Sequence, residues 1–477
     1  MNHHDIKPRI NSGIGSGISF GEFHPSQSES EVNDSPRRAA WAAKTHTPAT
    51  QDLLDRDDAA FLHQSISTPC LNAIRKAENI WIEDTDGRRY MDFHGNNVHH
   101  IGYGHPRLKR AISQQMDELP FAPRRFTCEP AVALAEKLAA IAPGDLSKVL
   151  FATGGSDAIE IALKIARINT GRYKTVSFWD SFHGAGFGAS SIGGEQLFRS
   201  GRVGPLLPGT EHVPSFAAYR NPFGIDHCRD TPRDTEVGDM VARILRHTLE
   251  REGDVAAVIA EPNRAVPYIP PPGFWQQIRR ACDDFGALLI FDEIPTGLGK
   301  TGEMFACDHD QVVPDILVMG KALGGGIVPI SAVLCKPELD QAGEYAIGHY
   351  THEKNPVTAR AALTTIEIIE DEGLVENAAT VGAWAMQRMN DMMDRLPLIG
   401  DVRGRGFLMG LELVEDRDTK APANDAAEQV FYRALDMGLS FKVSMGNVLT
   451  LYPALVTNRE QMETALDIIE TAIAEVT

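Results

Sequence analysis

The sequence contains no apolar run that approaches the ~20 residues needed to span a membrane, and its first residues carry no apolar core of the signal-peptide kind. It is also short of positive charge, because 46 Lys and Arg residues stand against 65 Asp and Glu residues, for a net charge of −19. Nucleic acids and anionic membranes both require a basic surface on their partner. We therefore expect neither of them as a partner.

Cysteine is scarce and shows no pattern. The six cysteines contain no CxxC pair, which is typical of reduced thiols in a cytoplasmic protein rather than of a disulfide framework. Four histidines lie close together in sequence, but they lack helical HxxxH spacing and have no cysteine or carboxylate partners, so we predict no metal site. The cysteines are Cys70, Cys128, Cys228, Cys282, Cys307 and Cys335, and the histidines are His94, His99, His100 and His105.

The most informative part of the chain contains two short apolar runs, 287–291 and 316–319, of the kind that forms buried strands of a parallel sheet. The first run leads into Asp292 and the second into Lys321. Because ligands of open α/β sheets bind at the carboxyl ends of the strands, we expect this acid and this amine to face one crevice. Pyridoxal phosphate needs such a pair, since the amine bonds to the cofactor and the carboxylate keeps its ring nitrogen protonated.

A lone Asp and a lone Lys at strand ends would more often be an ordinary ion pair. Here Asp292 begins the string DEIPTGLGKTG, and Lys321 belongs to GKALGGG. These strings resemble the class III (ornithine/GABA-type) aminotransferases, a family of pyridoxal phosphate enzymes, and the resemblance extends from about Gln51 to the end of the chain. It implies an α/β protein of fold type I, with a large doubly wound, mainly parallel sheet domain and a smaller α+β domain, in which Lys321 and Asp292 are catalytic.

Composition and this resemblance together predict four segments. Residues 1–50 are rich in Gly, Ser, Pro, His and charge, and we expect a disordered tail there. Residues 51–115 are expected to be an N-terminal segment of the small domain, 116–358 the large cofactor-binding domain, and 359–477 the C-terminal small domain. Within the large domain, Phe198 to Glu236 is rich in Gly and Pro, and a long irregular segment of this kind often forms an active-site loop or lid.

A phosphate site is predicted where the apolar string KVLFAT meets a Gly-Gly-Ser turn and a helical pattern. The N-terminus of a helix presents free N–H groups and a partial positive charge, which together attract anions. Gly154, Gly155 and Ser156 form this turn. A Gly-rich turn is a weak signal by itself, but the matching turn of the family holds the cofactor phosphate, and the resemblance implies the same role here.

The resemblance places further residues around the cofactor. Phe182 and His183 match an aromatic-His-Gly string whose aromatic ring stacks on the cofactor, whereas a phenylalanine after a strand without this string would more often belong to the core. Glu261 belongs to the dipeptide EP, which family members place beside the substrate, and Glu261 and Ile294 are both expected to bind the cofactor. Thr351 matches a threonine that reaches the cofactor phosphate of the neighbouring subunit, which implies a homodimer with shared active sites.

Two departures from the family pattern bear on the reaction. Pro295 stands where a glutamine usually contacts the ring hydroxyl, and proline has no donor to offer. Thr450 stands where many members carry the arginine that binds the carboxylate of a keto acid, and a hydroxyl cannot form that bidentate, charge-assisted pair. The second departure argues against the half-reaction in which a transaminase passes its amino group to a keto acid.

Basic groups occur at unusual positions in the same regions. Arg124, Arg125 and Arg264, together with Lys354, would suit a dianionic substrate group if they converge, although Arg124 and Arg125 would equally suit a solvated surface. Asn97 belongs to the HGNN string, which replaces a small-residue loop that faces the substrate in the family. We therefore include Asn97 among the candidate substrate-binding residues.

The strings HQSISTPCLN, MDFHGNNVHHIGYGHP and GHYTHEKNP most resemble the ammonia-lyases of this family that act on (R)-1-hydroxy-2-aminoethylphosphonate. This resemblance implies a small primary amine as substrate and elimination of its β-hydroxyl, which gives phosphonoacetaldehyde and ammonia. The alternative is a transaminase that moves an amino group from an amine or ω-amino acid to a keto acid.

Overall fold

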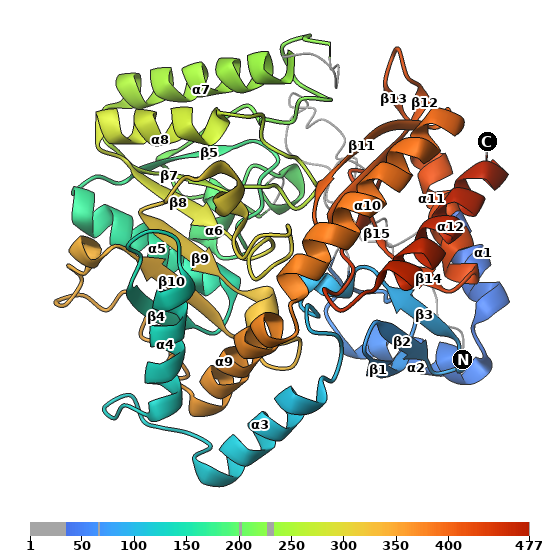
Figure 1. Cartoon of the computed structure of the whole chain (residues 1–477), viewed down its shortest axis with the longest axis horizontal. Helices are drawn as coiled ribbons and strands as arrows, with labels where there is room; N and C mark the ends of the chain where they lie inside the picture. The colour runs from blue at the N-terminus through green and yellow to red at the C-terminus, as the bar shows by residue number, and fades with distance from the viewer. Residues whose placement is uncertain (1–34, 65–66, 200–202, 227–232, 477) are drawn as a thin grey trace, which may run out of the picture.

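The computed structural model describes residues 35–64, 67–199, 203–226 and 233–476, which form the two lobes seen side by side in Figure 1. The larger lobe contains a seven-stranded sheet, and the smaller lobe contains a four-stranded and a five-stranded sheet. Cys228 lies outside the described residues, and the other five cysteines are free. None of the described helices is both long enough and apolar enough to cross a membrane.

The sheet of the larger lobe is mainly parallel, as predicted. Its strands are β4 (Lys148–Ala152), β5 (Lys174–Phe178), β6 (Thr210–Val213), β7 (Val255–Ala260), β8 (Leu288–Asp292), β9 (Ile316–Met319) and β10 (Ser331–Cys335). They are arranged in the order β4-β10-β9-β8-β7-β5-β6. Strand β10 runs antiparallel to β9 and to β4, and the remaining neighbours are parallel.

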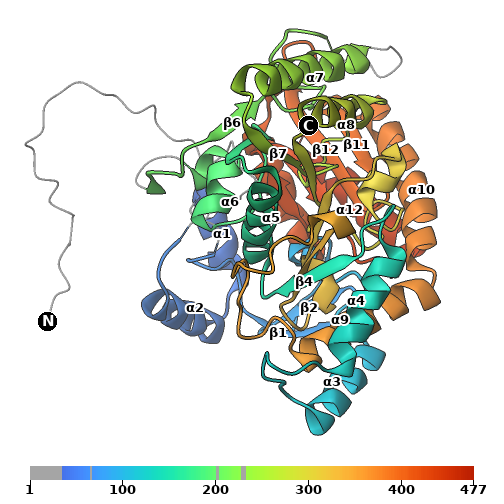
Figure 2. The same cartoon turned by 90° about the vertical axis from the view of Figure 1, so that its left-hand side faces the viewer.

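Helices cover both faces of this sheet. The helices of the lobe are α3 (Pro106–Glu118), α4 (Glu129–Ile141), α5 (Gly155–Thr170), α6 (Phe187–Ile192), α7 (Arg233–Glu252), α8 (Phe274–Phe285) and α9 (Pro356–Asp371). Leu289 and Phe291 of β8 belong to the core that contains α8, whereas Ile290 between them belongs to the core that contains α5. Figures 1 and 2 show α5 and α8 on opposite sides of the sheet. Because both faces are covered, the central strands β7 and β9 contain apolar residues only.

The smaller lobe joins the two ends of the described chain. Its four-stranded sheet contains β1 (Ile74–Glu78), β2 (Trp81–Asp84), β3 (Arg89–Asp92) and β14 (Leu439–Ser440). Strand β14 pairs in parallel with β3, with Leu439 opposite Met91. The five-stranded sheet and its helices comprise β11 (Ile399–Arg405), β12 (Leu408–Asp416), β13 (Ala421–Pro422), β15 (Lys442–Ser444), β16 (Val448–Leu451), α10 (Leu374–Arg395), α11 (Asn424–Asp436) and α12 (Arg459–Val476).

The expectation of a disordered tail over residues 1–50 is wrong for the second part of that range, because two helices lie between residues 36 and 60. Helices α1 (Pro36–Thr45) and α2 (Pro48–Ala60) each begin with a proline after a hydroxyl residue that caps the helix. Trp41 of α1 is buried, and α1 packs beside α11 (Figure 1), with an ion pair of 2.6 Å between Arg37 and Asp425. Residues 1–34, the first part of the expected tail, lie outside the described residues.

The expectation of an irregular segment from Phe198 to Glu236 is also wrong in part. Thr210–Val213 form the edge strand β6, which pairs in parallel with β5 along its whole length. The strand is short and only half-buried apart from Val213, so it lacks the apolar run that marks the central strands. Residues 200–202 and 227–232 of this segment lie outside the described residues.

A buried lysine lies where the two lobes meet. Lys300 is fully buried, and its Nζ donates a hydrogen bond of 2.8 Å to the backbone oxygen of Pro453. Burial lowers the pKa of Lys300 to about 7. His99 and His100 nearby are also buried, and burial lowers the pKa of both imidazoles, so this region disfavours added positive charge.

Lys300 predicts a dependence of stability on pH. The unfolded chain keeps the lysine proton up to its ordinary pKa of 10.5, whereas the folded chain loses it at about 7. Between these values the unfolded state binds more protons, so the free energy of unfolding rises with pH in this window, by at most about 1.4 kcal/mol per pH unit. In urea unfolding at pH 7, 8 and 9, the free energy of unfolding should rise more with pH for wild type than for Lys300→Met. Equal slopes for the two proteins would contradict the assignment.

Candidate active site

The carboxyl ends of β8 and β9 bring the predicted acid and amine to the same edge of the sheet. The two strands pair in parallel, with Asp292 opposite Val318, and Lys321 follows directly after β9. Asp292 is buried and Lys321 is half-buried. Lys321 has a φ of +41°, in the left-handed region that non-glycine residues rarely adopt. Such backbone strain concentrates at functional sites, which supports a role for this lysine beyond packing.

A histidine holds the buried carboxylate in place. His183 Nδ1 lies 2.8 Å from Asp292 Oδ2, and the backbone N–H of Ile294 donates to Asp292 Oδ1 at 3.0 Å. Both His183 and Asp292 are buried, so water does not compete for this hydrogen bond. The Nε2 atom of His183 is buried and has no hydrogen-bond partner among the described residues. The pair therefore presents a fixed carboxylate at the strand edge, suited to a positively charged ring nitrogen.

The predicted anion site lies at the start of α5, where Gly154 precedes the first helical residue and no side chain caps the free N–H groups. A Cβ at position 155 would lie 2.9 Å from Ile294 Cδ1, so glycine keeps room beside the turn. Ser156 Oγ accepts a hydrogen bond of 3.0 Å from the backbone N–H of Ala185, which ties the turn to the segment after His183. Glycine amides, an uncapped helix N-terminus and a serine hydroxyl form a donor set that fits a phosphate group.

Arg264 lies in a buried ion network rather than in an open anion site. Its guanidinium lies 3.1 Å from Glu261 and 3.2 Å from Glu195, and its Nε donates to the backbone oxygen of Asp180 at 2.6 Å. Glu261 in turn accepts a hydrogen bond of 3.2 Å from the backbone N–H of Phe182, so the network supports the predicted ring-stacking residue. Two carboxylates already offset the charge of Arg264, and binding of an anionic substrate by this residue stays a prediction.

Sequence reasoning missed Glu195. Glu195 directly follows the uncharged string SSIGG and is buried, with 2% of its surface exposed. A charged residue at the end of such a run is a usable signal, because buried carboxylates are almost always paired. Its partner, however, lies far along the chain, so the pairing with Arg264 could not be predicted.

The remaining basic candidates lie on two exposed loops that contact each other. Arg124 and Arg125 are exposed, and Arg124 Nη2 lies 2.8 Å from His349 Nε2. Thr351 and Lys354 are exposed on the loop that His349 begins. No hydrogen bond or ion pair among the described residues joins these loops to Arg264. The structure therefore does not bring the four basic candidates together within one chain.

The two departures from the family pattern have structural counterparts. Asn97 is buried, and its Nδ2 donates a hydrogen bond to the backbone oxygen of Pro295, while its Oδ1 has no partner among the described residues. Asn97 thus lies beside the strand-end segment that carries Asp292, on a turn that contacts the one opened by Lys321. Thr450 is fully buried, and its hydroxyl lies 3.0 Å from Ser444 Oγ. It brings no charge to the site.

A mainly parallel sheet of this topology, with Lys321 and Asp292 at one edge, defines an enzyme that uses pyridoxal 5′-phosphate. The sequence model of the class III aminotransferases matches residues 63–473, and the chain belongs to that family. A relative from Vibrio splendidus, named (R)-1-hydroxy-2-aminoethylphosphonate ammonia-lyase, is 47% identical over 461 residues, which cover 94% of this chain and 95% of the relative. Leucine/methionine racemase from Thermococcus litoralis is 37% identical and covers 89% of this chain and 96% of that protein.

Solved structures agree with this assignment. An amine transaminase from an uncultivated Pseudomonas species, crystallised with bound PLP, is 30% identical, with a TM-score of 0.81, over 88% of this chain and 99% of that one. An (S)-enantioselective omega-transaminase from Thermomicrobium roseum is 29% identical, with a TM-score of 0.82, over 91% of this chain and 99% of that one. The fold and the cofactor predicted from the sequence are confirmed.

Proposed function

We propose that the protein is an ammonia-lyase that acts on 1-hydroxy-2-aminoethylphosphonate and yields phosphonoacetaldehyde and ammonia. The observation that carries this proposal is the 47% identity, over nearly the full length of both chains, to the Vibrio splendidus ammonia-lyase. Thr450 supports it, because this buried hydroxyl offers no charge to a keto acid acceptor. We also propose that the enzyme works in the cytoplasm, as part of phosphonate metabolism, which the free cysteines and the relative's substrate support.

The residues of the site are assigned roles in holding the cofactor. Lys321 would bond to it and Asp292 would hold its ring nitrogen, with His183 fixing the carboxylate at 2.8 Å. The turn formed by Gly154, Gly155 and Ser156 would bind its phosphate at the start of α5. Phe182 and Ile294 would cover the two faces of its ring, and Glu261 supports Phe182 through the backbone N–H.

The reaction balances without an added oxidant or acceptor. When bound, the cofactor withdraws the electron pair that is released at the carbon bearing the amino group. Lys321 would accept the proton from that carbon, the electron pair would form a C=C bond, and the β C–O bond would break, so that hydroxide leaves and takes up a proton as water. The resulting enamine is hydrolysed to the aldehyde and ammonia, which consumes one water for the one released.

Transamination is the second candidate, because the solved structures that match over most of the chain are transaminases. The two functions differ in whether a keto acid is required. Purified enzyme is expected to release ammonia from 1-hydroxy-2-aminoethylphosphonate through many turnovers with no keto acid present. If ammonia stays below one equivalent of enzyme and amino transfer appears only after a keto acid is added, the protein is a transaminase.

We further propose a homodimer whose active sites are shared, with Thr351 reaching the cofactor phosphate of the other subunit. The exposed position of Thr351, beside Arg124 and His349, supports a contact that one chain alone leaves open. Exposed aromatic side chains on the same two loops, Phe121, Phe126 and Tyr345, support it as well.

Subunit mixing tests this dimer. An inactive Lys321→Ala chain and a chain impaired by Thr351→Ala are each expected to be weak alone, because each lacks one part of every site. Mixed dimers contain one site with both residues intact, so activity is expected to recover to about a quarter to a half of wild type. Exchange is checked with differently tagged chains. Complete exchange with no recovery would contradict a shared site.

A further inference from the structure

A second pocket lies beside the active site, between the two lobes. It has a volume of about 730 Å³, and its walls include Trp179, Asp180 and Arg199 from the larger lobe and Glu412 and Met445 from the smaller lobe. Neither Lys321 nor Asp292 lines it. Asp180 nevertheless connects it to the active site, because its backbone oxygen accepts from Arg264, which pairs with Glu261. The pocket is thus separated from the reaction centre by the buried network around Arg264.

Arg199 brings an uncompensated positive charge to this pocket. Its Nη1 lies 3.0 Å from Nε2 and 3.3 Å from Nδ1 of the His212 ring, and Nε2 also lies 3.0 Å from the backbone oxygen of Gly193. Burial lowers the pKa of His212 to about 4, so the ring is neutral and accepts from the arginine without offsetting its charge. The guanidinium also lies over the Trp179 ring at 5.1 Å. No carboxylate pairs with Arg199 among the described residues, and most of its five N–H donors are unused.

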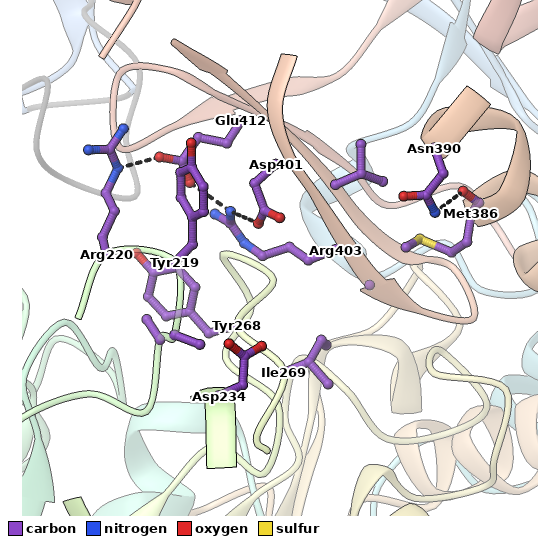
Figure 3. Close-up of a pocket in the computed structure, with 14 residues that line it drawn as sticks. Tyr219, Arg220, Asp234, Tyr268, Ile269, Met386, Asn390, Asp401, Arg403 and Glu412 are labelled. Atoms are coloured by element: carbon purple, nitrogen blue, oxygen red, sulfur yellow. Dashed lines mark hydrogen bonds and ion pairs between the residues drawn. The ribbon is translucent and has the colours of Figure 1, made fainter. Parts of the chain in front are cut away.

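The other arginine of the pocket, Arg220, has a carboxylate partner. Arg220 forms an ion pair with Glu412, and the same carboxylate lies 2.6 Å from Arg403, which also pairs with Asp401 at 2.8 Å. Figure 3 shows this cluster in the adjoining cavity, with Glu412 between the two arginines. The charge of Arg220 is therefore engaged within the protein, and the available cation of the pocket is that of Arg199.

Asp180 supplies the opposite charge. Its carboxylate forms no hydrogen bond or ion pair with the described residues, although its backbone is held by Arg264. Burial raises the pKa of the Asp180 carboxyl, and the charge of Arg264 works against this. The residue itself lies in the turn after β5, with a φ of +66°. The pocket thus offers one carboxyl group that forms no hydrogen bond with the described residues as well as one arginine that no described carboxylate pairs with.

We propose that this pocket binds a zwitterionic small molecule that carries an oxyanion and an ammonium group, with the oxyanion on Arg199 and the ammonium on Asp180. Aminoalkylphosphonates have this chemistry, so the inference rests on the proposed function for the identity of the ligand. Arginine binds phosphonate oxygens through paired N–H donors, and the Trp179 ring keeps the guanidinium plane in position. Because the walls belong to both lobes, the ligand would also hold the lobes together beside the buried network around Arg264.

The test is calorimetric titration of the cofactor-loaded enzyme, after borohydride reduction has blocked bonding of amines at Lys321, with 2-aminoethylphosphonate. This probe has no β-hydroxyl to eliminate, and bound cofactor occupies the anion site at Ser156. Arg199→Met and Asp180→Asn are expected to weaken binding about ten- to a hundred-fold, the range of one charge-assisted contact. Arg199→Lys keeps the charge but loses the paired donors and the planar group over Trp179, so its affinity is expected to lie between those of wild type and Arg199→Met. Arg246→Met, an exposed arginine paired with Asp284, is the matched control and is expected to bind as wild type does.

Three results would overturn the proposal: no binding to the reduced wild type at millimolar ligand, unchanged affinity in both variants, or inorganic phosphate binding as tightly as 2-aminoethylphosphonate. If Arg199→Met misfolds, the affinity of Asp180→Asn for 2-aminoethylphosphonate, compared with that of wild type, tests the proposal alone. The outcome is independent of turnover. If wild type releases ammonia but the variants bind 2-aminoethylphosphonate as tightly as wild type does, the proposed function stands and the pocket proposal fails. If the variants bind 2-aminoethylphosphonate more weakly but wild type releases no ammonia from the hydroxylated substrate, the pocket proposal stands and the proposed function fails.

Discussion

Replacing Lys321 with alanine is expected to abolish sustained ammonia release, with a loss of at least about 10³-fold in kcat, the scale of removing both a nucleophile and a proton-transfer group. The half-buried amine after β9 is the one predicted to bond the cofactor, and its backbone has a strained φ of +41°. The variant is expected to retain cofactor without the absorbance band of a lysine-linked form. Absorbance spectra and a coupled ammonia assay measure both effects.

Lys300→Met serves as the control for this experiment. It removes another lysine of the larger lobe, but one that is fully buried and bonded to the backbone of Pro453 rather than exposed to the strand edge. Its spectrum is expected to match that of wild type. A Lys321→Ala enzyme that keeps both the band and its turnover would remove Lys321 from the mechanism.

Asp292→Asn is expected to lower kcat on the order of 10²–10³-fold, the typical effect of losing one preorganised electrostatic contact. The substitution keeps the shape of the side chain but removes the negative charge that is proposed to hold the cofactor ring nitrogen, and it weakens the hydrogen bond from His183. KM is expected to change little, because the substrate does not contact this group. Steady-state kinetics together with circular dichroism separate a catalytic loss from a folding defect.

Asp315→Asn is the matched comparison for Asp292. Asp315 is also buried in the large sheet, but it precedes β9 at the opposite edge and pairs with Arg279 and Lys336. Its loss is expected to lower the thermal midpoint and leave the kcat of folded enzyme near that of wild type. If Asp292→Asn behaves in the same way, with only stability affected, then Asp292 is a structural residue.

The centre of the fold and the cofactor edge were predictable because their signals are local. The runs that form β8 and β9 are apolar, and each ends at or beside a residue predicted to carry the chemistry. The uncapped start of α5 was predictable for the same reason, since a glycine turn and the helical pattern of α5 are adjacent in the sequence. Parallel strands place their carboxyl ends together, so two local signals were enough to define a shared edge.

What could not be predicted depends on partners that are distant in the sequence. The sequence alone made Arg264 a candidate for anion binding. Only the fold shows that Glu195 and Glu261 pair with its guanidinium. Helix α1 lies in a polar segment whose stability comes from contacts with α11, at the other end of the chain, through ion pairs such as Arg37–Asp425. The free charges of Arg199 and Asp180 are likewise visible only once the neighbouring residues are known.

The parallel pairing of β3 with β14 has a consequence for how the protein is made. Met91 emerges from the ribosome early, but Leu439, its neighbour in the sheet, follows only after the whole larger lobe has been synthesised. At about 5–20 residues per second, that delay is roughly 20–70 s. The larger lobe contains all seven of its strands by then and can fold first, while the β1–β3 segment waits with one edge unpaired. A chain that stops before β14 would therefore expose that edge permanently, and we expect such truncated chains to aggregate rather than to accumulate as a soluble large lobe.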